Sequence, residues 1–248
     1  MMRLLTNGMK IGNATVVVDI IQKGNPEIRP GTPMKPKKIT THNTGNASKG
    51  ANAKAHNTYI HNLASYHPKD TTHVSWHLSV DDKFIYQHIP FDEIAWHCGD
   101  GGGVNSGNRT SIGVEICENP DMNYGQAENN AIELTVLLMK EFNLKPSDVV
   151  PHQHWSGKYC PRVILKRDGS FTLYRNRVAT AFKAPEKEET RMFNPSSPTL
   201  KKAVVDKIES ATKAKVLSDG KWLLQAKAGT LSLDDALALW VHIDNAKK

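Results

Sequence analysis

The 248-residue sequence has no long hydrophobic run and little cysteine. No stretch approaches the roughly 18 consecutive apolar residues of a membrane-spanning helix, which excludes that class of segment. Cysteine occurs only three times, and this small, odd number argues against a disulfide framework. A chain of this length buries a sizeable core without such cross-links and divides into one or two domains.

An arginine-rich stripe and the apolar core of a secretory signal are also missing. Lysine and arginine outnumber the acidic residues by 32 to 25, a net charge of +7 that predicts an anionic partner such as nucleic acid, a membrane surface or a wall polymer. The excess is +5 over residues 1–185 and +2 over 186–248. This diffuse distribution weakens the nucleic-acid hypothesis. Residues 1–13 lack a signal-type apolar core, so we expect a cytoplasmic protein or one released by another route.

The pattern up to residue 185 predicts one α/β domain. Short runs rich in β-branched residues predict strands over residues 15–21, 38–42, 73–80, 83–89 and 110–117. Capping residues and apolar spacing predict helices over residues 50–63, 126–142 and 170–182. We therefore expect a mixed central β-sheet flanked by helices.

The composition changes after residue 185. Residues 186–198 combine a charged run with prolines and serines and are interpreted as a linker. Residues 199–248 carry helical punctuation, including Gly229 as a helix end and Ser232 as a helix start. We expect a small all-α bundle there, and the apolar spacing in its last helix predicts that one face packs inward, formed by Leu233, Leu237, Trp240 and Val241.

Histidine is abundant: ten of the 11 histidines precede residue 155. The segment PHQHWSGKYCP places His152 and Cys160 eight residues apart, and Ser156-Gly157 between them can fold the chain back. Histidine and cysteine are preferred zinc ligands, and a catalytic zinc takes three protein ligands and keeps one open position. His42, at the end of a predicted strand, is the best third ligand. Ordinary surface or core histidines remain the alternative from spacing alone.

Six motifs occur in a fixed order along residues 25–165: TTHNT, SWHLSVDD, IYQHIP, AWHCGDG, NRTSIGVEIC and PHQHWSGKYCP. In these motifs the chain resembles the zinc-dependent N-acetylmuramoyl-L-alanine amidases of the amidase-2 and peptidoglycan recognition protein family. It looks most like Bacillus-type autolysins and prophage endolysins. The resemblance implies a hydrolase that uses zinc-activated water to cleave the amide bond between N-acetylmuramic acid and L-alanine. It also implies peptidoglycan as partner, action at the cell wall and no nucleic acid.

The resemblance assigns roles to five residues. The family's zinc ligands fall on His42, His152 and Cys160, and its lysine falls on Lys158 as a stabiliser of the oxyanion. The glutamate of its Gram-positive branch falls on Glu115, which is the expected general base.

Alternation along SIGVEIC agrees with that role for Glu115. It places Ile112, Val114 and Ile116 on one face and Glu115 on the other. An exposed strand carboxylate is the alternative. Trp76 stands where the phage-lysozyme branch has a tyrosine, and its lack of an ionisable hydroxyl gives Glu115 more weight.

Substrate contacts are expected from four residues in or beside the motifs: Trp76, His77, His97 and Arg109. Loop and packing roles are the alternative for each. Cys98 and Cys117 are expected to be structural thiols.

Two other functions stay open. One is a non-catalytic peptidoglycan-binding protein of the same fold, although such relatives typically lack the cysteine ligand. The other is a nucleic-acid-binding protein with a structural zinc. By the usual endolysin layout residues 199–248 form a wall-binding module, and a stabilising or dimerising role is the alternative. The sequence leaves the oligomeric state open, and also whether this is a phage lysin or an autolysin.

Overall fold

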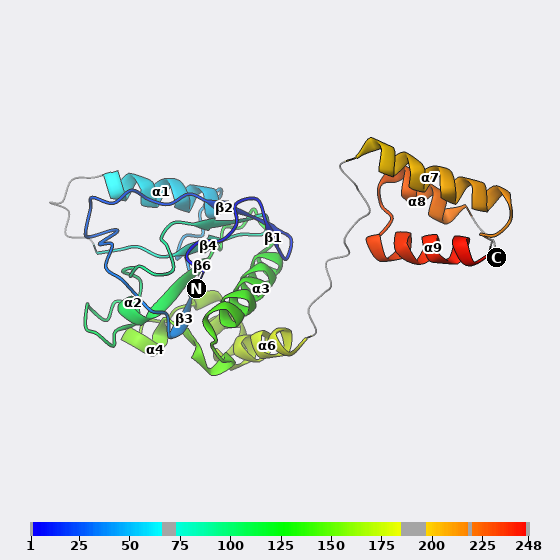
Figure 1. The fold of residues 1–248 in the computed structure, drawn as a ribbon. Coiled ribbons are helices and arrows are strands. Elements are labelled where there is room, and N and C mark those ends of the chain that lie inside the picture. Colours follow the sequence, from blue (N-terminus) through cyan, green and yellow to red (C-terminus); the bar gives the residue numbers. More distant parts are fainter. Residues whose placement is uncertain (1, 66–72, 185–196, 218–219, 247–248) are drawn as a thin grey trace. The chain divides into compact units, whose positions relative to one another are not determined.

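The computed structural model describes residues 2–65, 73–184, 197–217 and 220–246. The chain divides into two compact units, Met1–Ala184 and Pro185–Lys248, which are described separately (Figure 1). The predicted linker over residues 186–198 lies almost wholly outside the described residues. None of the described helices is long and apolar enough to cross a membrane.

The first unit contains a mixed seven-stranded sheet with the order β1-β2-β5-β4-β6-β3-β7. Its strands are β1 (Lys10–Ile11), β2 (Ala14–Val18), β3 (Lys38–Asn43), β4 (Leu78–Val80), β5 (Phe84–Gln87), β6 (Ser111–Ile116) and β7 (Val149–Pro151). The pairs β1–β2 and β4–β5 are antiparallel, and the other four pairs are parallel. The predicted mixed central sheet is confirmed.

Helices cover both faces of this sheet, with α1 on one side and α3 and α6 on the other (Figure 1). The helical segments of the unit are α1 (Ala53–Ser65), α2 (Gly107–Thr110), α3 (Tyr124–Phe142), η1 (Pro146–Asp148), α4 (Gln153–Ser156), α5 (Arg162–Asp168) and α6 (Thr172–Lys183). Ile112, Val114 and Ile116 of β6 are fully buried in one core with Leu134 and Leu138 of α3. The alternation in β6 therefore turns Glu115 to the opposite face.

The central parallel strands fix the position of the chemistry. The register of β3 and β6 pairs His42 with Glu115 and Asn43 with Ile116 at their carboxyl ends. In open α/β sheets ligands bind beyond the carboxyl ends of the strands.

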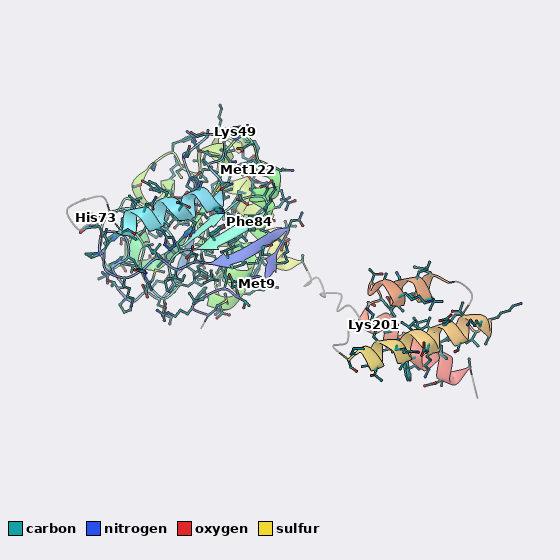
Figure 2. The ribbon with its side chains drawn as sticks, turned by 90° about the horizontal axis from the view of Figure 1, so that it is seen from above. Met9, Lys49, His73, Phe84, Met122 and Lys201 are labelled. Atoms are coloured by element: carbon teal, nitrogen blue, oxygen red, sulfur yellow. The ribbon has the colours of Figure 1, made fainter. Side chains whose placement is uncertain are left out.

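The strand predicted over residues 73–80 is mostly wrong, since only Leu78–Val80 pairs within the sheet. Ser75 instead exchanges hydrogen bonds with Trp96: its N–H donates to the Trp96 carbonyl, and its Oγ accepts from the Trp96 N–H. Ser75 is therefore bonded to a loop and not to a neighbouring strand. In Figure 2, His73 lies beside the C-terminal end of α1.

The second unit consists of helices α7 (Pro198–Lys213), α8 (Lys221–Ala228) and α9 (Leu233–Asn245). Two predicted end signals are confirmed. Gly229 ends α8 in the left-handed conformation, at φ 72°, and the Ser232 side chain accepts a hydrogen bond from the Asp235 N–H at the start of α9. The apolar core is formed by Val204, Ile208, Ala211, Leu217, Ala226, Leu231, Ala236, Leu239 and Ile243.

The predicted inner face of α9 is wrong. Leu237, Trp240 and Val241 are exposed, with 58%, 38% and 58% of their surface accessible. Ala236, Leu239 and Ile243 face the core instead. The helix carries two adjacent apolar stripes, so the spacing did not decide between them. One part of the exposed Trp240 ring contacts Lys207, whose ammonium lies 3.5 Å from the ring centroid.

Candidate active site

A cavity of about 740 Å³ opens at the carboxyl ends of β3 and β6. His42, Glu115, His152, Lys158 and Cys160 all line it. These are the five residues to which the sequence assigned metal-binding and catalytic roles. The structure brings them together from segments up to 118 positions apart in the chain.

Three ligand-type side chains converge in this cavity. The Nδ1 atoms of His42 and His152 are 3.0 Å apart, and Cys160 Sγ lies 3.8 Å from His42 Nδ1. All three residues are buried, with at most 5% of their surface exposed.

The loop that carries two of these residues is tied to β3. The His152 N–H donates to the Thr41 carbonyl at 3.2 Å, directly after β7. Gly157, with φ 76°, adopts the left-handed conformation that turns the chain back. The Gln153 N–H then donates to the Cys160 carbonyl at 3.1 Å and closes the loop. The Ser156-Gly157 turn that the sequence suggested thus brings Cys160 back beside His152.

The two separations measured from His42 Nδ1 are compatible with a tetrahedral zinc ion. With Zn–N near 2.05 Å and Zn–S near 2.3 Å, tetrahedral geometry separates two nitrogens by about 3.3 Å and a nitrogen from a sulfur by about 3.6 Å. The observed 3.0 and 3.8 Å are close to these values. Glu115, which lines the same cavity, has a buried Oε2 with no hydrogen-bond partner among the described residues.

A second compact group shares His42 but uses the other side of its ring. It consists of His42, His97 and Cys98. His42 Nε2 lies 3.0 Å from His97 Nδ1, which in turn lies 3.2 Å from Cys98 Sγ. Cys98 is fully buried and does not line the cavity. The group that opens on the cavity is therefore the one formed with His152 and Cys160.

Burial controls the protonation of the site in the absence of a metal ion. It raises the pKa of Glu115 to about 8, against the Lys158 ammonium, which lowers it. Burial also lowers the pKa of His42 well below its ordinary value and raises the pKa of Cys160 to about 12. Glu115 Oε1 lies 3.7 Å from His42 Nδ1. A bound cation favours the deprotonated forms of such groups.

The four expected substrate contacts divide into two pairs. Trp76 and His97 line the cavity. His77 is fully buried beneath it, with Nε2 2.9 Å from the Glu93 carbonyl and Nδ1 accepting from the Gly113 N–H. His77 is therefore not among the residues that line the cavity. Arg109 is half-buried on α2 and does not line the cavity either.

Sequence reasoning missed several residues of the cavity wall, among them His56 and Tyr59 on α1. Tyr59 is half exposed, and its ring is nearly parallel to that of Trp76 at a centroid distance of 6.4 Å. His56 and Tyr59 are three positions apart in a predicted helix, and residues at this spacing share a helix face. That spacing was the signal available in the sequence. Trp76 is held in turn by a hydrogen bond from Nε1 to Ser79 Oγ.

Known proteins match the part of the chain that carries the candidate active site. Residues 32–163 match the family model described as N-acetylmuramoyl-L-alanine amidase. The chain is 48% identical over 157 residues to the N-acetylmuramoyl-L-alanine amidase CwlH of Bacillus subtilis (strain 168), covering 63% of this chain and 59% of that protein. It is 50% identical over 158 residues to XlyA of the same strain, covering 62% and 50%. The chain therefore spans only about half the length of these relatives.

A solved structure agrees with the sequence matches. The catalytic domain of XlyA superposes with a TM-score of 0.59 at 44% identity, over 66% of this chain and 99% of that one. The family model covers more than half of the chain, including β3, β6 and the loop with His152 and Cys160. The chain belongs to the N-acetylmuramoyl-L-alanine amidase family.

Proposed function

We propose that this protein hydrolyses the amide bond between N-acetylmuramic acid and L-alanine in peptidoglycan, with a zinc ion held by His42, His152 and Cys160. The observation that carries the proposal is the convergence of three buried ligand atoms with Glu115 and Lys158 on one open cavity. The family match and the names of the relatives support the same reaction.

The donor set favours zinc. Two imidazole nitrogens and one thiolate suit Zn²⁺ better than the hard cations Mg²⁺ and Ca²⁺, which prefer oxygen ligands. When bound, zinc supplies Lewis acidity that polarises a carbonyl and lowers the pKa of water toward neutrality. Three protein ligands leave the open position that such chemistry needs.

Glu115 acts as the general base and then as the general acid. Its carboxylate lies on the cavity side of β6, where it accepts a proton from the water that attacks the lactyl carbonyl. The same carboxyl then donates that proton to the departing amine of L-alanine, so the reaction needs no covalent enzyme intermediate. Burial raises the pKa of Glu115 in the metal-free protein, and a bound cation would favour the carboxylate form that accepts a proton.

Lys158 supplies positive charge for the oxyanion. It is exposed at the cavity wall, two residues before Cys160 and on the loop closed by Gln153. Its ammonium stabilises charge that develops on the carbonyl oxygen, a contribution worth about 100- to 1000-fold in rate in comparable sites.

The remaining wall of the cavity suits a glycan–peptide polymer. Tyr59 presents exposed aromatic surface on the cavity wall, and the buried Trp76 ring lies beside it at a centroid distance of 6.4 Å. Residues 199–248 then act as a wall-binding module that raises residence on the insoluble substrate through effective concentration. On this proposal the protein acts at the bacterial cell wall.

A product assay tests the proposed reaction. Purified Gram-positive walls are incubated with the full chain, and turbidity, new L-alanine amino termini and reducing sugars are followed together. We expect turbidity to fall as amino termini appear, with no reducing sugar. Release of reducing sugar would identify a glycosidase instead. Binding to the walls without any new amino termini would identify a non-catalytic protein of the same fold.

A further inference from the structure

The ring of His97 lies directly behind His42, on the side away from the cavity ligands. His42 Nε2 and His97 Nδ1 are 3.0 Å apart, and His97 Nε2 lies 3.2 Å from the Ser111 carbonyl oxygen. Ser111 is the first residue of β6, the strand that also carries Glu115. The contacts form a continuous line from the backbone of β6 through two imidazole rings to the metal cluster.

The hydrogen-bond partners decide where the protons sit. A carbonyl oxygen only accepts, so His97 Nε2 carries a proton, and in the neutral ring His97 Nδ1 is then an acceptor. His42 Nε2 donates to it, which leaves His42 Nδ1 unprotonated. That lone pair faces His152 Nδ1 and Cys160 Sγ.

We propose that His97 is a positioning residue that holds His42 in the tautomer and orientation required to bind the metal through Nδ1. Metal-ligating histidines generally donate their second ring N–H to a carboxylate, a backbone carbonyl or water. Here a second histidine takes that place and passes the bond on to the Ser111 carbonyl. The inference rests on the metal site of the proposed function.

The surroundings hold the His97 ring in this position. A Cβ on Gly113 would lie 2.7 Å from His97 Nδ1, so only glycine at this point of β6 leaves room for the ring. Asn108 Oδ1 accepts from the backbone N–H groups of His97 and Cys98, both at 2.7 Å. The Cys98 thiol, a weak donor, lies 3.2 Å from His97 Nδ1, which agrees with an acceptor at that nitrogen.

The tautomers are measurable in the native chain without any substitution. Two-bond ¹H–¹⁵N correlation spectra of the metal-free full chain distinguish protonated from unprotonated ring nitrogens. We expect both His97 and His42 to carry their proton on Nε2. A proton on His97 Nδ1 would overturn the proposal.

Zinc affinity provides the second test, by competition with a chromophoric chelator. Loss of such a supporting partner typically weakens metal binding about 10- to 100-fold, and we expect this for His97→Leu. His97→Asn places an amide oxygen, which is also an acceptor, near the position of Nδ1. We expect this variant to recover part of the zinc affinity that His97→Leu loses. His88→Asn is the control, because the His88 ring is also buried and its nitrogens lie within hydrogen-bond distance of Asn57 and Ser79, away from His42.

The outcomes separate the two proposals. Zinc binding by the native chain with unchanged affinity in both His97 variants overturns the positioning role and leaves the metal site intact. A native chain that binds no zinc overturns both. Equal weakening in the His97 variants and in His88→Asn would indicate general destabilisation and also contradict the positioning role.

Discussion

Replacing Glu115 by glutamine (Glu115→Gln) separates two effects of this side chain. One is the cost of its burial to the folding stability, and the other is its proposed role as the general base. In the metal-free protein, burial raises the pKa of Glu115 from 4.5 to about 8. The unfolded chain therefore ionises from pH 4.5 upward, whereas the folded chain keeps the proton until about pH 8. Stability is lost across that interval as the pH rises. At about 1.4 kcal/mol per pH unit, the cost reaches about 3 kcal/mol at pH 7 and stays below about 1 kcal/mol at pH 5.

Glutamine removes this cost because it has no proton to lose and nearly the same shape. We expect metal-free Glu115→Gln to be more stable than the native chain by about 3 kcal/mol at pH 7, with little difference at pH 5. Urea denaturation of the metal-free full chain at the two pH values measures the change. Glu133→Gln, an exposed glutamate of α3, is the matched control and should change neither value.

The same substitution should abolish most of the activity. Loss of a general base costs about 100- to 10,000-fold in rate, and zinc binding should persist because no proposed ligand changes. An equal stability difference at pH 5 and pH 7 would refute the burial argument. Full hydrolytic activity in Glu115→Gln would refute the assignment of the base.

Three further substitutions test the other parts of the site and the second unit. Cys160→Ser should lose tightly bound zinc, as measured by metal analysis after gel filtration, and retention of one equivalent would contradict the ligand set. Lys158→Met should keep zinc but lower kcat by about 100- to 1000-fold, and a change in KM alone would contradict its role at the oxyanion. Trp240→Ala, on the exposed face of α9, should weaken co-sedimentation with insoluble walls and leave hydrolysis of soluble muropeptides unchanged. Unchanged sedimentation would contradict a wall-binding role for that face.

Local periodicity predicted the parts of the site that depend on one strand or one loop. Alternation in β6 placed Glu115 opposite Ile112 and Val114, and the structure agrees because those residues are buried against α3. The turn at Gly157 brought Cys160 back to His152 as expected. Both features are set by backbone geometry over a few residues, so the sequence alone carries them.

Features set by distant contacts escaped that reasoning. The placement of His97 behind His42 depends on a hydrogen bond between residues 55 positions apart. His77 was expected to line the cleft from its motif, yet its ring is fully buried and hydrogen-bonded to backbone groups of Glu93 and Gly113. Such contacts are decided by how the strands and loops assemble and have no local sequence signal.

The prediction of the inner face of α9 was wrong for a different reason. Two apolar stripes of similar strength run along the helix, one through Leu239 and Ile243 and one through Leu237 and Val241. Periodicity identifies a helix with apolar stripes, but packing within the second unit, chiefly against α7, selects the buried stripe. The short strands β1 and β7 were missed because two or three residues carry too little alternation to detect.

Titration of the hydrolytic activity with zinc tests the central claim most directly. The full chain is stripped with a chelator, zinc is returned in known amounts, and new L-alanine amino termini from purified walls are measured against bound metal. The account predicts that activity disappears on stripping, returns in proportion to bound zinc and saturates at one equivalent per chain. Release of L-alanine termini at an unchanged rate by the stripped protein would contradict it.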